Sequence, residues 1–116
     1  MADEIHYVGE IVRLAVVAHV SRSPTVSTPL VPADINDGGA TISVWRKGAD
    51  DFSVHEEPLV WDDAYEVWRY NWDTTNEEPG TYLVKSTFTG PGGLRSWEID
   101  SETVRLTADK TLVVDP

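Results

Sequence analysis

The chain has 116 residues, a formal net charge of −11 from 20 acidic and nine basic side chains, and no cysteine. This length suits one domain with one core, and the acidic excess repels phosphate backbones and anionic headgroups, so neither nucleic acid nor a membrane is expected as a partner. Without cysteine, disulfides, thiolate catalysis and Cys-ligated zinc are excluded.

Residues 1–7 are expected to form an N-terminal arm, and residues 8–20, rich in Val and Ile, are expected to form the first long strand. Even-numbered residues from Val12 to Ala18 then share one face, and odd-numbered residues from Ile11 to Val17 share the other. Both faces are largely apolar. We therefore expect the outer face to be covered as well, for example by another subunit.

Residues 21–37 interrupt the strand pattern with three prolines. Pro24, Pro29 and Pro32 remove backbone donors and disfavour helix. The segment is expected to be a long surface loop or an extended edge, and loops of this length often carry contacts.

Short strands separated by turns are predicted for the middle of the chain. Gly38 and Gly39 supply a turn before a strand at residues 40–46, and residues 47–51 turn the chain again. Two further short strands, 52–55 and 58–61, are expected on either side of an acidic kink.

The densest aromatic pattern lies between residues 62 and 88. Trp68, Tyr70 and Trp72 alternate in one run, residues 76–80 form a polar turn, and residues 81–89 form a second run. Two alternating runs joined by a turn predict a β-hairpin.

A turn at residues 90–93 then leads to two last strands, 95–99 and 103–107. The chain is therefore expected to be an all-β, antiparallel, immunoglobulin-like (Ig-like) sandwich at residues 8–107, with a C-terminal tail at residues 108–116.

Catalytic and metal-binding patterns are absent from the sequence. The histidines are widely separated and have no nucleophile motif beside them: His6, His19 and His55. Residues 34–39 resemble the start of an EF-hand loop, but Trp45 stands where the bidentate Glu is required, which leaves a plain turn or loose calcium binding. We predict no enzyme and no cofactor. A small hydrolase using Asp62, Asp63 and Glu66 is a rival hypothesis.

Five tryptophans need an explanation: Trp45, Trp61, Trp68, Trp72 and Trp97. They fill the core, serve a protein interface, or stack on sugars as exposed rings. In a cysteine-free sandwich, core packing is favoured, and Trp68 and Trp72 are expected to be the buried pair.

Several segments together resemble the small Ig-like virion proteins of tailed phages and related viruses. They are the opening strand Val8-Gly9-Glu10-Ile11-Val12-Arg13-Leu14, a Trp-bearing second strand, the segment Pro79-Gly80-Thr81-Tyr82-Leu83-Val84, and a closing strand near Val104. Gly-Thr-Tyr after a proline turn is typical of domains in which the Tyr ring packs at a sheet corner. The longer proline-rich loop and the tryptophan content depart from the usual pattern.

The resemblance implies a structural, non-enzymatic virion protein, most simply a head decoration protein that binds the major capsid protein or another virion protein. A homo-oligomer is left open, and the alternative is a carbohydrate-binding or adhesion module on a tail or baseplate. The chain would be made in the host cytoplasm, since no secretion signal is evident, and would end in the virion. The expected contact residues are His6, Tyr7, Arg22, Val26, Leu30, Leu112 and Val113.

Overall fold

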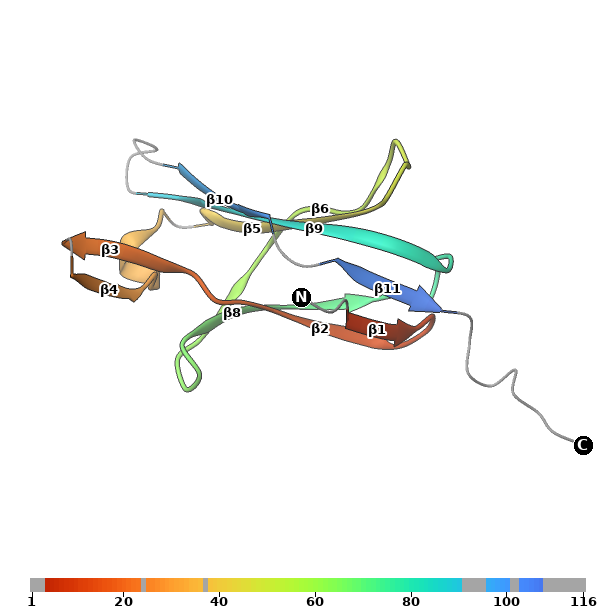
Figure 1. The fold of residues 1–116 in the computed structure, drawn as a ribbon, viewed down its shortest axis with the longest axis horizontal. Coiled ribbons are helices and arrows are strands. Elements are labelled where there is room, and N and C mark those ends of the chain that lie inside the picture. The colour runs from red at the N-terminus through yellow and green to blue at the C-terminus, as the bar shows by residue number, and fades with distance from the viewer. Residues whose placement is uncertain (1–3, 24, 37, 91–95, 101–102, 108–116) are drawn as a thin grey trace, which may run out of the picture.

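The computed structural model describes residues 4–23, 25–36, 38–90, 96–100 and 103–107. Within these residues the chain forms eleven β-strands and one short 3-10 helix, η1 (Pro32–Asp34). Two sheets face each other across one apolar core (Figure 1). The predicted all-β sandwich is confirmed.

The larger sheet has the order β1-β11-β9-β5-β6, and β10 also pairs with β9. Its strands are β1 (Glu4–Tyr7), β5 (Ala40–Arg46), β6 (Phe52–Pro58), β9 (Gly80–Thr89), β10 (Ser96–Asp100) and β11 (Val104–Thr107). Neighbouring strands are antiparallel except β1 and β11, which are parallel. Residues 4–7 of the expected arm therefore form an edge strand, and the strand at residues 40–46 has the predicted bounds.

The smaller sheet has the order β2-β8-β7, with β2 (Ile11–Val16), β7 (Val60–Asp62) and β8 (Val67–Asp73). The predicted hairpin between the two aromatic runs is wrong, because β8 pairs with β2 and β7 whereas β9 pairs with strands of the larger sheet. A turn signal predicts that the chain reverses. It does not determine whether the returning strand joins the same sheet or the opposite one.

This arrangement is that of an Ig-like sandwich. In such folds, whose seven strands are lettered A to G in chain order, strands B, E and D share one sheet, and strands C and F pair in the other. Here β2, β8 and β7 take the places of B, E and D, and β5 and β9 take those of C and F. The step from β8 to β9 is the corner at which the chain crosses between sheets (Figure 1).

The core is built from the alternating faces that the sequence predicts. Along β2 the even-numbered residues are buried and the odd-numbered residues are exposed, and the even-numbered residues of β9 from Tyr82 to Phe88 are buried. Trp68 and Trp72 are 5% and 2% exposed, so the prediction that they form the buried pair is confirmed. Both rings make edge-to-face contacts with rings of the opposite sheet. The ring centroids of Trp72 and Tyr82 lie 5.1 Å apart, and those of Trp68 and Phe88 lie 5.6 Å apart.

The proline-containing segment differs from the expected loop. It contains β3 (His19–Ser23) and β4 (Val26–Pro29), which pair antiparallel with one irregularity, and then η1. The expected first strand of residues 8–20 is thus divided into β2 and the start of β3. Pro29 is tolerated because β4 is the edge of a two-stranded ribbon, where a missing donor costs little.

The acidic kink is present but does not separate two strands. Glu56 has φ 50° and lies within β6, where the register with β5 shifts. The strand instead ends before Leu59, where the chain leaves the larger sheet and continues as β7 of the smaller sheet. The Leu59 N–H donates to the carbonyl of Ala40 at 2.9 Å, which ties this crossing to the start of β5.

Candidate functional site

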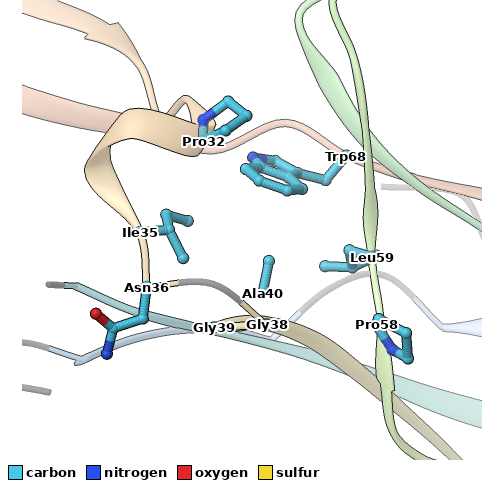
Figure 2. Close-up of a pocket in the computed structure, with 9 residues that line it drawn as sticks. All are labelled: Pro32, Ile35, Asn36, Gly38, Gly39, Ala40, Pro58, Leu59 and Trp68. Atoms are coloured by element: carbon cyan, nitrogen blue, oxygen red, sulfur yellow. The ribbon is translucent and has the colours of Figure 1, made fainter.

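One hollow opens between η1, the start of β5, and the crossing from β6 to β7. It has a volume of about 420 Å³ and is lined by Pro32, Ile35, Asn36, Gly38, Gly39, Ala40, Pro58, Leu59 and Trp68. Figure 2 shows the side chains of Ile35, Ala40, Leu59 and Trp68 converging on the same space, whereas that of Asn36 points away from it. We call this the apolar pocket.

Backbone hydrogen bonds hold the floor of the apolar pocket against the end of β9. The Asn36 N–H donates to the Thr89 carbonyl at 2.8 Å, and the Thr89 N–H donates to the Gly39 carbonyl at 2.9 Å. A Cβ atom on Gly39 would lie 2.7 Å from the Thr89 oxygen and 2.9 Å from that of Asn36. Glycine is required at position 39 because two backbone carbonyls approach it this closely.

The roof of the apolar pocket is the Trp68 ring, which is fixed in place. Its Nε1–H donates to the Leu30 carbonyl at 2.9 Å in a buried hydrogen bond. Among the described residues that line the pocket, none is acidic or basic. Its described walls can therefore hold a small apolar group.

A second hollow, of about 580 Å³, lies beside the corner between β8 and β9 and is polar. Its lining includes four carboxylates, Asp50, Asp51, Glu77 and Glu78, together with Arg46, Ser53 and Tyr82. Three interactions connect five of these residues to one another. Ser53 Oγ donates to Glu77 Oε1 at 2.8 Å, Tyr82 Oη donates to the Glu78 carbonyl at 2.7 Å, and Arg46 pairs with Glu78 at 3.7 Å.

The environment of Tyr82 makes its phenol a poor acid. Burial raises the pKa of Tyr82, and the negative charge of Glu77 raises it further. The phenol therefore stays protonated and acts as a hydrogen-bond donor.

Among the described residues, no group of three His, Cys, Asp or Glu side chains could hold a metal ion.

The outer face of the smaller sheet carries exposed apolar side chains around one ion pair. Ile11, Val17 and Val60 are 53%, 61% and 67% exposed. Beside them Arg69 Nε donates to Asp62 Oδ2 at 2.6 Å, and the Arg69 guanidinium lies 5.4 Å from the centre of the Tyr65 ring. This face matches the expectation that the odd-numbered side of the first strand is apolar.

Asp62 is an organiser of the turn between β7 and β8. Besides pairing with Arg69, it accepts the backbone N–H groups of Ala64 and Tyr65 at 3.1 and 3.3 Å. The hydrogen bond from Arg69 is the main reason that the pKa of Asp62 is lowered. A carboxylate held in its charged form by Arg69 is unsuited to act as a general acid.

The predicted contact residues lie at two separate ends of the molecule. His6 and Tyr7 end β1, whereas Arg22 and Val26 belong to β3 and β4 at the tip of the other end (Figure 1). Leu30 directly follows β4, and its side chain is 3% exposed, as part of the core. Leu112 and Val113 lie outside the described residues. None of these positions is tested as a contact, so they stay predictions.

Exposed aromatic rings gather on the larger sheet. Phe52 is 49% exposed, its ring stacks on His55 at 4.4 Å, and Trp45 approaches it edge-on at 5.6 Å. Trp45 and Trp61 are half-buried. The side chain of Trp97 is not described.

Sequence patterns did not reveal the apolar pocket. Its lining comes from η1 and the loop after it, β5, the β6–β7 crossing and β8, and each residue looks like ordinary turn or core sequence. Gly38 and Gly39 belong to a turn that the sequence predicts. The other members come together through tertiary structure.

Comparison with known proteins returns no relative. No protein family, no curated protein and no solved structure matches the chain. Among the described residues, no helix has the length and apolar character needed to cross a bilayer.

Proposed function

We propose that the chain is a structural virion protein of a tailed phage or related virus, which decorates the head by binding the major capsid shell. One observation carries the proposal: two of the candidate contact elements, β1 and the ribbon of β3 and β4, lie at opposite ends of the Ig-like sandwich (Figure 1). A protein that binds through both of its ends can bridge two neighbouring shell subunits. Its resemblance to small Ig-like virion proteins gives the proposal its biological setting.

The first end is the end of β1, where Tyr7 is 40% exposed and the nearby Ile5 is 61% exposed. β1 is an edge strand of four residues anchored on one side by β11. His6 Nδ1 and Glu10 Oε1 lie 3.7 Å apart at the turn that follows. This end therefore combines aromatic, apolar and charged groups, a composition suited to a protein interface.

The second end is the ribbon of β3 and β4, whose strands leave the sandwich together. It is tied to the sandwich at its base, where the Leu30 N–H donates to the Ala18 carbonyl at 2.9 Å. Weak contacts at both ends would reinforce each other on a repeating shell, because binding at one end raises the effective concentration at the other.

The test is re-decoration of particles that lack this chain. Purified protein should cosediment with such particles, and electron microscopy should show one elongated density spanning two shell subunits. Tyr7→Ala and an Arg22→Ala/Val26→Ala pair should each reduce occupancy strongly, since avidity needs both ends. Tyr65→Ala, an exposed aromatic change on the β7–β8 turn, is the control. Particles that bind the double variant as well as wild type would contradict the bridging arrangement.

A second candidate function is a carbohydrate-binding or adhesion module on a tail or baseplate. The observation that favours it is the exposed ring pair of Phe52 and His55, backed by Trp45. A small hollow of about 180 Å³ beside these rings is also lined by Asp50 and Asp51, whose carboxylates could accept sugar hydroxyl groups. A glycan array followed by tryptophan-fluorescence titration would test it, with Phe52→Ala abolishing any signal.

A further inference from the structure

The free edge of β2 differs from the other edges of the described sheets. β2 has six residues in unbroken register with β8 and contains no proline, and within the described residues it has no neighbour on its other side. Open edges of this kind invite pairing with another strand unless they are short, charged, bulged or interrupted by proline.

The other edges all carry such protection. β1 and β7 have four and three residues. β6 is bulged at Glu56 and ends in Pro58, and β10 includes Glu98 and Asp100 within five residues. In the two-stranded ribbon, β4 contains Pro29 and the pairing of β3 is irregular between Ser21 and Ser23. β2 is therefore the edge best suited to accept a partner strand by β-augmentation.

Charge limits which surface of this molecule can meet a second copy. Two chains of net charge −11 repel each other unless they touch where acidic groups are absent. The outward side chains of β2 are Ile11, Arg13 and Ala15, and the exposed Val17 directly follows the strand; none of these residues is acidic. Ile11 and Val17 are also among the most exposed large apolar side chains of the described residues.

We propose that β2 pairs antiparallel with β2 of a second copy, forming a two-fold symmetric dimer with one continuous six-stranded sheet. Such an interface is self-complementary, because the two-fold axis repeats every contact between two residues with the copies exchanged. The axis passes through Leu14, so Ile11 of each copy faces Val17 of the other and Arg13 faces Ala15. The inference does not depend on the proposed virion function.

Side-chain alternation leaves few registers, and charge selects among them. Outward residues must face outward residues, so the axis can pass through Arg13, Leu14 or Ala15. An axis through Arg13 sets two like charges directly opposite, which is destabilising. An axis through Ala15 places Ile11 opposite His19 instead of an apolar partner. The axis through Leu14 joins the two exposed apolar side chains at both ends of the ladder.

Sedimentation-equilibrium measurements on the full chain over a wide concentration range test the proposal. Wild type should dimerise reversibly. Ile11→Lys and Val17→Glu should each weaken the dimer by at least about tenfold, whereas the double variant I11K/V17E should recover most of the affinity, because the introduced lysine of each copy then faces the introduced glutamate of the other. An equimolar mixture of the two single variants should also form heterodimers.

Val60→Lys is the matched control, since Val60 is equally exposed on the same face but lies on β7, away from the β2 edge. Ile11→Lys changes the net charge of each copy from −11 to −10, so general repulsion alone would strengthen association. Near-ultraviolet circular dichroism checks that each variant is folded.

Cysteine cross-linking tests the register, because the native chain has no cysteine. An I11C/V17C double variant should form disulfide-linked dimers on mild oxidation, and R13C alone should not. A wild-type chain that stays monomeric at every concentration overturns the proposal. So does a dimer that tolerates both single charge variants, or one that cross-links through R13C.

Discussion

Tyr82 joins the two sheets at their corner, because its ring packs 5.1 Å from that of Trp72 in the opposite sheet and its hydroxyl donates to the carbonyl of Glu78 at 2.7 Å. The ring contact spans the core, and the hydrogen bond closes the turn that carries the chain from β8 to β9. One side chain thus fixes both the spacing of the sheets and the path between them. A Tyr in this place is a feature of Ig-like sandwiches.

Tyr82→Phe should lower the free energy of unfolding by about 1 kcal/mol, because it removes one hydrogen bond and leaves the ring in place. Urea unfolding followed by tryptophan fluorescence measures the loss. Tyr70→Phe is the control, since Tyr70 is half-buried and its hydroxyl makes no hydrogen bond among the described residues. An equal loss in both variants would mean that the corner bond contributes nothing specific.

The two buried tryptophans should differ in their tolerance of phenylalanine. Trp68 Nε1 donates to the Leu30 carbonyl, whereas Trp72 Nε1 is buried without a hydrogen-bond partner among the described residues. Trp68→Phe should therefore cost about 2 kcal/mol more than Trp72→Phe, because it leaves a buried carbonyl unsatisfied while the second change removes an unsatisfied donor. Thermal and urea unfolding of the two variants, compared at equal expression and purity, give the ranking. The reverse order would contradict this account of the core.

Thr74 should be the most sensitive polar residue of the turn region. Its side chain is fully buried, and its Oγ1 donates to the Glu10 carbonyl at 2.7 Å and accepts the Gly9 N–H at 3.0 Å. Thr74→Val keeps the shape but loses both bonds and should cost about 2–3 kcal/mol, whereas Thr74→Ser keeps the hydroxyl and should cost about 1 kcal/mol. Denaturant unfolding distinguishes them, and a valine variant as stable as the serine variant would refute the role of the hydroxyl.

The pair of Asp62 and Arg69 predicts a pH-dependent contribution to stability. Because the pKa of Asp62 is lowered in the folded chain, its carboxylate stabilises the fold fully above the ordinary value of 3.8, and that contribution is lost as the pH falls through the lower folded value. The stability difference between wild type and Asp62→Asn should be constant near neutrality and shrink at acid pH.

Unfolding of wild type and Asp62→Asn at a series of pH values from neutral to strongly acid measures this difference. Asp63→Asn serves as the control. A wild-type advantage over Asp62→Asn that is unchanged at the lowest pH would show that the carboxylate charge is not what stabilises the turn.

The alternation of apolar and polar residues was enough to predict most strands. Val12 to Ala18 were predicted to share one face, and the burial of Trp68 and Trp72 was anticipated, because side-chain direction in a strand has a period of two and follows from local sequence. Turn residues marked where the chain reverses. The two-sheet, all-β class follows from these local properties.

Only the tertiary structure decided which strands became neighbours. The run ending at Trp72 and the run containing Tyr82 were predicted to form one hairpin, yet they belong to opposite sheets, and the rings of Trp72 and Tyr82 meet across the core. The same packing creates the apolar pocket and leaves β2 with a free edge. Strand periodicity is a local property of the backbone, whereas strand partners depend on contacts between residues far apart in the chain.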